Sequence, residues 1–427
     1  MNKTISKISL SLGILSVTFA LLLSPLSANA EVQRENSFDS IIVKPKEEFK
    51  ATKRFSKLMY KSGVLRYKKV KENLYVIPIS ETENPNEKIE ELKQSGRFSL
   101  VEPDYKLTID QNTPERNYIK ITKVQIEDTL PVSDPNNLQE VTPNDKDFNS
   151  QYYLRETNVT KAWNATVGDP SLLIGVLDTG IDASHPDLKG KIIGGFNTNG
   201  NDLKDEVGHG TEVAGIIAAN TNNDQGIAGI TWNTKVLSLR ITDEFGQARV
   251  STVVHALEEA YNKGVKIVHV SLSTNQFSQT LKDAIKETQD RGILVVSTSG
   301  NTGIQELRYP AAFDGVIGVG AVDENKQLES YSTIGEHVKL VAPGSFIYTT
   351  STGSSYDHVT GTSFAAPQVT GAVALLLSIT PNLTSNEVKE ILFNSTEDLG
   401  NTGKDLSYGY GLLNTEKAVQ LAKVKKH

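Results

Sequence analysis

The sequence predicts an α/β protein: a parallel sheet with helices on both faces, preceded by a small α+β domain. The chain of 427 residues is long enough for about two or three domains of roughly 150 residues. From residue 151 onward, apolar strand-like runs alternate with helix-like segments, which is typical of a parallel sheet covered on both faces. Residues 31–108 carry 16 Lys or Arg and 13 Asp or Glu, whereas the whole chain has a net charge of −7. A small basic segment therefore precedes a large acidic one.

The N-terminus predicts a secretory signal peptide over residues 1–30. Two lysines, an apolar stretch over residues 8–23 and the A-x-A cleavage pattern Ala28-Asn29-Ala30 follow one another in the required order. An uncleaved anchor helix is the alternative, but the apolar stretch is shorter than the about 20 residues that a span needs. The last residues form neither a hydrophobic tail nor a wall-sorting motif. We therefore expect a secreted, extracellular, monomeric protein without a membrane anchor.

The composition excludes several kinds of site. The chain contains no cysteine, which removes disulfides, thiolate metal sites and cysteine nucleophiles. Its mild negative charge argues against nucleic acid as a partner. Stability must therefore come from core packing, helped by a bound metal if one is present.

Residues 31–108 read as a β-α-β-β-α-β domain, and a domain of about 80 residues is only marginally stable alone. Its strands are expected at Ser40–Lys44, Val64–Val70, Leu74–Ile79 and Ser99–Pro103, and its helices at Phe49–Lys61 and Asn86–Ser95. Residues 109–144 are polar and rich in proline. They predict an exposed linker in which a protease would cut.

The main domain is expected over residues 145–427. Its strands are predicted at Leu172–Leu177, Lys235–Ile241, Val265–Leu272, Gly292–Ser297, Gly315–Val322 and Val338–Val341. Its helices are predicted at Ser251–Lys263, Ser278–Arg291, Thr384–Asn394 and Thr415–Lys423. Functional side chains in such sheets gather beyond the carboxyl ends of the strands.

Four polar residues stand in glycine-framed motifs at such positions: Asp178, His209, Asn301 and Ser363. Each has an ordinary structural interpretation: a strand-end carboxylate, a helix-packing imidazole, a turn amide and a helix N-cap. Together they supply a carboxylate, a general base, an oxyanion donor and a hydroxyl at a helix N-terminus, where developing negative charge is favoured. Among the remaining histidines, His269 lies in an apolar strand and is expected in the core.

At these motifs the sequence resembles the subtilisin-like serine proteases, or subtilases. The matching motifs are Asp178-Thr179-Gly180, His209-Gly210-Thr211, Gly300-Asn301 and Gly361-Thr362-Ser363-Phe364-Ala365-Ala366-Pro367. The likeness covers roughly residues 145–423. It implies that Ser363 is the nucleophile, His209 the base, Asp178 its orienting carboxylate and Asn301 an oxyanion donor.

The resemblance also implies a substrate-binding site and an inhibitory propeptide. The segment 38–107 is similar to the propeptide that inhibits these enzymes and assists their folding, so the domain over residues 31–108 would be the chain's own inhibitor. The substrate would be a peptide or protein. The substrate-binding residues implied are Ser271, Leu272, Ser273, Thr298, Ser299, Gly300 and Arg308.

A structural calcium ion is a further implication of the resemblance. The segment Asn220–Ile227 is similar to the calcium loop of subtilases, and oxygen ligands from separate segments suit Ca²⁺. An asparagine-rich solvated loop is the alternative. The expected ligands are Asp145, Asp187, Asn220, Asn223, Gln225 and Ile227.

Departures from the family pattern bear on specificity. Glu212 stands where many subtilases have a second histidine, and Ser273 and Arg308 replace small residues of the substrate-binding region. With the long linker, Glu212 makes the chain look like lantibiotic leader peptidases, which cut after a basic residue. A basic substrate side chain would lie close to the guanidinium of Arg308, and the two positive charges would repel each other. Either Arg308 turns away to pair with a neighbour such as Glu306, or the preference is not for Arg.

Three functions are therefore open. The first is removal of the leader from a lantibiotic precursor, and the second is general extracellular proteolysis. A catalytically silent binding protein on a protease scaffold is the third, and the complete set of four motifs argues against it.

Overall fold

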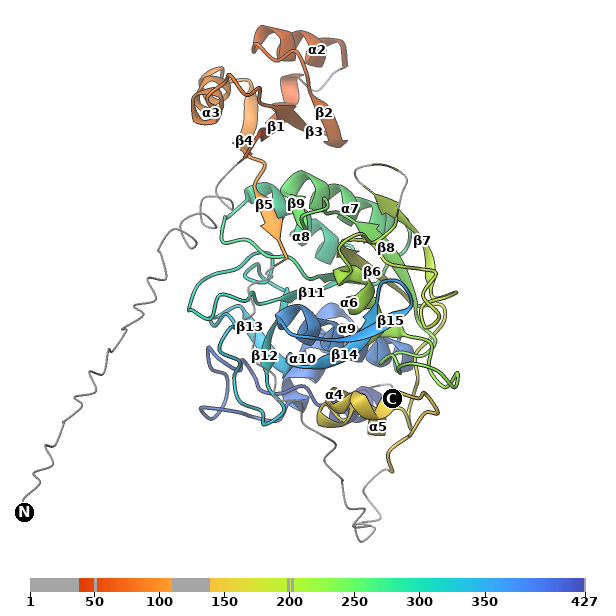
Figure 1. The fold of residues 1–427 in the computed structure, drawn as a ribbon. Coiled ribbons are helices and arrows are strands. Elements are labelled where there is room, and N and C mark those ends of the chain that lie inside the picture. The colour runs from red at the N-terminus through yellow and green to blue at the C-terminus, as the bar shows by residue number, and fades with distance from the viewer. Residues whose placement is uncertain (1–37, 50–51, 110–138, 198–199, 201–202, 426–427) are drawn as a thin grey trace, which may run out of the picture. The chain divides into compact units, whose positions relative to one another are not determined.

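The computed structural model describes residues 38–49, 52–109, 139–197, 200 and 203–425. These residues belong to one unit, Glu35–His427. The predicted signal peptide and the middle of the predicted linker lie outside the described residues. Figure 1 shows a smaller domain, coloured red to orange, joined to a larger one.

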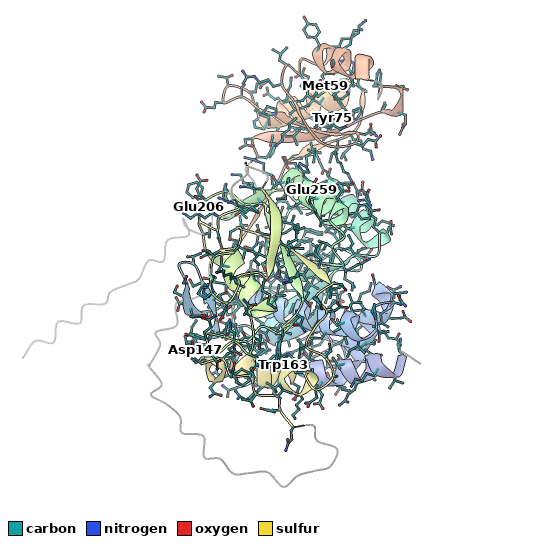
Figure 2. All side chains as sticks on the ribbon, turned by 90° about the vertical axis from the view of Figure 1, so that its right-hand side faces the viewer. Met59, Tyr75, Asp147, Trp163, Glu206 and Glu259 are labelled. Carbon is teal, nitrogen blue, oxygen red and sulfur yellow. The ribbon has the colours of Figure 1, made fainter. Side chains whose placement is uncertain are left out.

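The smaller domain is an antiparallel sheet with the strand order β2-β3-β1-β4 and two helices on one face. Met59 and Leu92, from the two helices, are fully buried, and Tyr75 stacks on Phe55 with ring centroids 4.0 Å apart; Figure 2 labels Met59 and Tyr75. The predicted β-α-β-β-α-β order is confirmed. The elements are β1 (Ser40–Pro45), α2 (Thr52–Lys61), β2 (Lys68–Lys71), β3 (Leu74–Pro78), α3 (Pro85–Gln94) and β4 (Phe98–Pro103), with a short 3-10 turn η1 (Glu47–Phe49) before α2.

One strand of this domain begins later than predicted. β2 starts at Lys68 rather than at Val64, because Val64 ends the turn that closes α2. The backbone N–H of Val64 donates to the carbonyl of Met59 at 2.9 Å, and Gly63 adopts φ +69°, a conformation that favours glycine. Val64 is apolar because it is buried beneath the helix end, and not because it belongs to a strand.

The larger domain is built on seven strands in the order β13-β12-β11-β10-β6-β8-β7. All the pairings are parallel, as the sequence predicts. Chain order reverses between β6 and β10, and the carboxyl ends of the strands at such a point form a crevice where ligands bind. The strands are β6 (Leu173–Asp178), β7 (Ile192–Asn197), β8 (Lys235–Arg240), β10 (Ile267–Val270), β11 (Leu294–Thr298), β12 (Ile317–Val322) and β13 (Val338–Pro343).

Both faces of this sheet are covered by helices. Within β6, Ile174 and Val176 join the cluster that contains α6 (His209–Ala218) and α9 (Thr362–Ile379). The alternate residues Leu173 and Leu177 join the cluster that contains α7 (Val250–Asn262) and α8 (Gln279–Asp290). Alternating side chains of one strand thus reach opposite cores.

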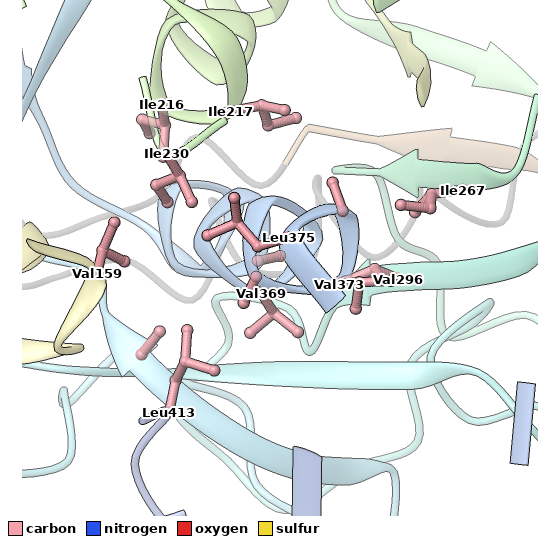
Figure 3. Packing of buried hydrophobic residues seen from close by; sticks show 14 of the residues in the cluster. Val159, Ile216, Ile217, Ile230, Ile267, Val296, Val369, Val373, Leu375 and Leu413 are labelled. Atoms are coloured by element: carbon pink, nitrogen blue, oxygen red, sulfur yellow. The ribbon is translucent and has the colours of Figure 1, made fainter. Parts of the chain in front are cut away.

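Helix α9 is the centre of the core. It is the one helix among the described residues long and apolar enough to cross a membrane, yet 17 of its 18 residues are buried inside the protein. Figure 3 shows Val369, Val373 and Leu375 of α9 surrounded by apolar side chains of the strands and of neighbouring segments. Its apolar composition is explained by this burial.

The remaining elements include several that the sequence did not predict. Strand β7 was not predicted because it contains the pair Gly194-Gly195, which interrupts its apolar run. A Cβ on Gly195 would lie 2.4 Å from the carbonyl oxygen of Ser238, so the close pairing of these strands requires glycine there. The short elements are η2 (Phe148–Ser150), α4 (Tyr152–Glu156), α5 (Val159–Ala162) and β9 (Gln247–Arg249), and a hairpin consists of β14 (Ile347–Ser351) and β15 (Ser355–Val359). The predicted C-terminal helices are α10 (Ser385–Ser395) and α11 (Thr415–Lys425).

The structure describes only the two ends of the exposed linker predicted over residues 109–144: Ile109 is buried, whereas Gln139, Glu140, Thr142 and Asn144 are exposed. Strand β5 (Lys106–Thr108) pairs antiparallel with β9, and Ile109, which follows it, is only 8% exposed. At the other end, the N–H of Val141 donates to the carbonyl of Thr160 at 3.0 Å. The apolar side chains of Ile109 and Val141 thus anchor the ends of the segment in the core. The polar average composition of the segment gave no sign of these contacts.

Candidate active site

Asp178 and His209 form a buried pair at the carboxyl end of the central sheet. Asp178 is the last residue of β6, and His209 is the first residue of α6. Asp178 Oδ1 lies 2.8 Å from His209 Nδ1, and the side chains are 1% and 9% exposed. The same oxygen accepts the N–H of Thr179 at 2.8 Å. The contact between Asp178 and His209 directs Nδ1 toward the carboxylate and leaves Nε2 to face a reactant.

A second carboxylate, Asp205, holds this pair in place and was missed by sequence reasoning. Its Oδ1 accepts the hydroxyl of Thr179 at 2.7 Å and the N–H groups of Val207 and Gly208. Its Oδ2 accepts both the N–H and the hydroxyl of Thr211. Asp205 therefore ties the residue after Asp178 to the first turn of α6. The signal available in the sequence was an acidic residue four positions before a helix start.

Ser363 lies in the first turn of α9, where backbone N–H groups are unpaired and favour negative charge. Its hydroxyl donates to the carbonyl of Ser271 at 3.3 Å. The adjacent Phe364 ring packs on the ring of His209, with centroids 5.3 Å apart. His209 Nε2 is buried without a hydrogen-bond partner among the described residues, so a proton acceptor is available beside this helix end.

Asn301 is held so that its amide nitrogen is directed toward the same helix end. Its side-chain oxygen accepts the N–H and the hydroxyl of Thr362, at 3.0 and 2.6 Å. A Cβ built on Gly361 would lie 3.2 Å from the amide nitrogen of Asn301. The structure therefore brings together the four residues predicted from the glycine-framed motifs.

The predicted substrate-binding residues form two buried walls next to Ser363. The first wall is Ser271–Ser273, and Ser273 exchanges two backbone hydrogen bonds of 3.0 Å with Thr108 of β5. The second is Thr298–Gly300, where the hydroxyl of Thr298 bonds to that of Thr362. A segment of the smaller domain thus already lies along the first wall.

His269 supports the first wall from within the core, as its predicted core position implies. Its Nε2 lies 2.6 Å from the hydroxyl of Ser271, and its Nδ1 lies 2.8 Å from the hydroxyl of Thr370 in α9. Burial lowers the pKa of His269 to about 3. The imidazole is therefore neutral and acts as a rigid hydrogen-bonded strut.

Arg308 lies against the first wall rather than turned away from it. Its side chain is 2% exposed, and its Nε and Nη2 donate to the hydroxyl of Ser273 at 3.1 and 2.9 Å. A longer contact of 3.4 Å joins Nη1 to Glu306. Glu306, the partner that the sequence offered, is thus engaged together with Ser273, but the guanidinium remains beside the predicted substrate-binding residues.

Only part of the predicted calcium set comes together. Asp145 accepts the N–H groups of Asn222 and Asn223. Burial and the charge of Asp187 raise the pKa of Asp145, and they outweigh these hydrogen bonds, which lower it. Asp187 accepts the side-chain amide of Asn223 at 2.9 Å. The carboxylates and one amide therefore meet, and a half-turn of that amide would direct its oxygen to the same side.

The other predicted ligands are placed differently. Ile227 presents its N–H to Asp187 at 2.9 Å, and the amide nitrogen of Asn220 donates to the carbonyls of Pro186 and Lys189. Gln225 donates its backbone N–H to Asn223. Tyr356, from a hairpin that the sequence did not predict, also donates its hydroxyl to Asp187 at 2.9 Å. The oxygen chemistry suits Ca²⁺, but neutral donors already satisfy much of Asp187.

Comparison with known proteins decides the family. The subtilase family model matches residues 169–411. This chain is a subtilase. It is 35% identical over 356 residues to the thermophilic serine proteinase of Bacillus sp. (strain AK1), a match that covers 81% of this chain and 86% of the relative.

Two further relatives agree. Thermitase of Thermoactinomyces vulgaris is 35% identical over 282 residues, which are 65% of this chain and 99% of the relative. The halolysin-like extracellular serine protease of Natrialba magadii is 34% identical over 287 residues, which are 65% of this chain and 52% of the relative. The subtilase described here is accordingly a serine endopeptidase.

Electrostatics around His209 in this subtilase are dominated by burial and by carboxylates. Burial opposes its protonation, but the charge and hydrogen bond of Asp178, with the charges of Glu212 and Asp205, leave the pKa of His209 raised above its ordinary value. Burial raises the pKa of Glu212 itself to about 7. As the pH falls, His209 therefore becomes protonated, and stops acting as a base, at a higher pH than an isolated histidine would.

The Asp205 network yields a first prediction. Asp205→Ala removes the acceptor of five hydrogen bonds, and we expect the free energy of unfolding to fall by about 3 kcal/mol because buried donors lose their partner. The measurement is urea denaturation in a Ser363→Ala background, which prevents self-digestion. The exposed Asp290→Ala is the control and should change stability by less than about 0.5 kcal/mol. Equal stability of the two variants would contradict the role of Asp205.

A second prediction concerns pH. Ionised Glu212 raises the pKa of His209, so Glu212→Gln should lower that pKa and extend activity to lower pH. We expect the acid limb of kcat/KM to move down by about half a pH unit, measured on a small amide substrate. Glu390→Gln, exposed on α10, should leave the profile in place. An unchanged or upward-moved limb in Glu212→Gln would refute the coupling.

Proposed function

We propose that this subtilase is a secreted endopeptidase that Asp178, His209 and Ser363 make active, and that it matures by cutting its own propeptide. The observation that carries the proposal is the 2.8 Å contact between Asp178 and His209, beside the helix turn that holds Ser363. The predicted signal peptide supports secretion. So does the relative from Natrialba magadii, whose name describes it as extracellular.

The chemistry follows from the positions of these three side chains. Ser363 Oγ attacks the carbonyl carbon of the bond to be cut, and its proton moves to Nε2 of His209. Asp178, held at Nδ1, keeps the imidazole oriented and stabilises its cationic form. His209 then returns the proton to the leaving amine. A water molecule repeats the sequence on the acyl-enzyme and releases the acid product.

Asn301 and the backbone N–H of Ser363 stabilise the oxyanion of the tetrahedral intermediate. Because Thr362 holds the side-chain oxygen of Asn301, its nitrogen needs no reorganisation when charge develops. Removing one such donor typically costs about 100- to 1,000-fold in kcat. The N-terminal turn of α9 adds favourable dipoles at the same place.

Residues 31–108 act as the intramolecular inhibitor in this proposal. Glu102 accepts the hydroxyl of Ser278 and the N–H groups of Gln279 and Thr280 at the start of α8. Asp104 accepts the N–H and hydroxyl of Ser251 at the start of α7. Carboxylates at helix N-termini favour docking, and docking supports β5 in the position of a bound peptide.

The natural substrate is a peptide or protein, and two ranges of substrate remain candidates. The enclosed guanidinium of Arg308 favours narrow specificity, and narrow specificity favours a processing enzyme, such as one that removes the leader of a lantibiotic precursor. General extracellular proteolysis is the second candidate. The cut after a basic residue, which leader removal was expected to require, is disfavoured by Arg308. Digestion of a leader-bearing precursor, compared with digestion of casein, separates the two.

A third prediction tests catalysis and maturation together. Ser363→Ala should reduce amide hydrolysis by about 10⁶-fold, because the nucleophile and base act as a unit, and the purified chain should remain uncut. Ser378→Ala, on the same helix, is the matched control and should mature normally. Hydrolysis and maturation are followed by fluorogenic assay and by N-terminal sequencing after expression in a protease-deficient host. Maturation of Ser363→Ala at the normal bond and rate would disprove self-cleavage.

The proposal includes a structural Ca²⁺ held by Asp145, Asp187 and Asn223. The ion would clamp the segment Asn220–Ile227 to the start of the larger domain. Two carboxylates from different segments, close enough for one to raise the pKa of the other, support it. The donors that already contact Asp187 argue that the clamp persists in weaker form without the ion.

The fourth prediction tests calcium. An ion that binds only the folded state stabilises it by about 2.7 kcal/mol at a hundredfold excess over its dissociation constant, so chelation should lower the Tm of the Ser363→Ala protein. Asp187→Ala should lose this sensitivity. Asp224→Ala, in the same loop but outside the proposed ligands, should keep it. Identical melting curves with calcium and with chelator would eliminate the ion from the proposal.

A further inference from the structure

Arg308 is a buried cation placed between the two walls of the substrate-binding site. Two of its guanidinium nitrogens contact the hydroxyl of Ser273 on the first wall. On the second wall, a Cβ built on Gly300 would lie 2.9 Å from Cγ of Arg308 and 3.2 Å from its Nε. Glycine at 300 thus makes room for the Arg308 stem, which brings the positive charge to Ser273.

The pairing of β5 indicates which substrate residue comes next to this cation. Thr108 and Ser273 exchange both backbone hydrogen bonds, which defines an antiparallel hydrogen-bonded pair. The next such pair along two antiparallel strands lies two residues further on. A substrate peptide that binds in the place of β5 and continues this register therefore puts the residue two positions beyond the one opposite Ser273 opposite Ser271. The carbonyl of Ser271 is 3.3 Å from Ser363 Oγ. That register position is therefore the residue before the cut.

Side-chain alternation indicates the face on which that residue projects. Leu107 and Ile109 join one apolar cluster together with Leu272. Directly opposed strand residues share a face, so Thr108 projects on the face of Ser273, opposite to Leu107 and Ile109. A substrate residue two positions later in the same register would project on that face too. On that face Ser273 meets Arg308. The side chain before the cut is thereby directed toward the guanidinium.

We propose that the pocket around Arg308 accepts an acidic side chain, aspartate or glutamate, at the residue before the cut. This inference rests on the proposed function and names the substrate class of the same site. A carboxylate and a guanidinium form charge-assisted hydrogen bonds, whereas a basic substrate side chain would bring two like charges together out of water.

Glu306 is a counter-ion that the substrate carboxylate has to outcompete. Its contact with Arg308 is 3.4 Å long, and its side chain is 23% exposed, against 2% for Arg308. A partly solvated carboxylate at that distance is a weak partner for a buried cation. A substrate carboxylate in the enclosed pocket meets the same cation with less competition from water.

The chain's own sequence fits this preference. The residue two positions after Thr108 is Asp110, which lies outside the described residues. The inference therefore assigns maturation to the bond between Asp110 and Gln111. Hydrolysis of that bond consumes one water, leaves a new carboxylate on Asp110 and releases a new amino group on Gln111.

The fifth prediction compares matched peptides. Blocked peptides of sequence Leu-Thr-Ile-Xaa, carrying a fluorogenic amide, present Asp, Glu, Asn, Ala or Arg as Xaa. We expect kcat/KM for Asp to exceed that for isosteric Asn by about 10- to 100-fold, the range of a hydrogen bond to a charged group. Arg should be the poorest. Equal rates for Asp and Asn, or fastest cleavage of Ala or Arg, would overturn the inference; fastest cleavage of Ala would mean that Arg308 merely fills the pocket.

Variants test the assignment to Arg308. Arg308→Gln should abolish the advantage of Asp over Asn, whereas Glu306→Gln should keep or enlarge it. If Arg308→Gln fails to fold, the comparison of Asp with Asn in the unaltered protein still decides. Labelling of Ser363 with an organophosphonate separates the two levels of failure. A labelled enzyme that prefers another residue disproves only the acidic pocket, and an unlabelled, inactive protein disproves the proposed function.

Maturation gives an independent readout. N-terminal sequencing of the matured protein should begin at Gln111, and Asp110→Asn should slow this cut by about the same 10- to 100-fold. Asp110→Glu is the conservative control and should mature at that bond. A first cut elsewhere, or equal rates for Asp110→Asn and the unaltered chain, would contradict the assignment of the bond.

Discussion

The close meeting of two buried helix N-termini is the constraint on which the site depends. Helix α6 begins with His209 and helix α9 with Thr362-Ser363, and the two share one core. The two helix starts touch directly: the ring of His209 packs on the ring of Phe364, with centroids 5.3 Å apart. Burial of α9 on all sides (Figure 3) fixes its axis and hence the place of Ser363.

This geometry concentrates charge of one sign around the general base. Asp178, Asp205 and Glu212 all act electrostatically on His209, and all three are part of, or directly precede, the elements that meet there. The cluster stabilises the imidazolium that forms during catalysis. Arg308 lies against the first wall, where it contacts Ser273. The cation proposed to attract a substrate carboxylate thus belongs to a different set of residues from the acidic cluster.

The sequence predicted the elements whose signals are local. Continuous apolar runs identified the strands β6, β8 and β10 to β13, and the four glycine-framed motifs identified Asp178, His209, Asn301 and Ser363. The prediction of these residues was possible because their motifs require a particular backbone conformation at a strand or helix end. Gly361, for example, adopts φ +152° just before the helix turn that carries Ser363.

What the sequence did not predict depends on contacts between distant segments. Asp205 reads as one more acidic residue in a polar loop until Thr179 and Thr211 donate to it. Tyr356 contacts Asp187 only because the hairpin β14–β15 packs against α6. The direction of Arg308, which the sequence left open, follows from its hydrogen bonds to Ser273. Side-chain partners separated by tens of residues carry no local periodicity.

The proposed propeptide and the proposed specificity pocket depend on each other. Strand β5 pairs with β9 (Figure 1), and Thr108 pairs with Ser273. In the proposed zymogen, the first peptide offered to the active site is therefore the chain's own. Docking carboxylates at α7 and α8 hold that peptide at a local concentration that no free substrate reaches. A pocket of narrow preference is compatible with such a zymogen only if the tethered segment satisfies the preference. Under the proposed preference, an acidic residue before the cut meets this requirement, whereas a basic residue there would make the enzyme a poor substrate for itself.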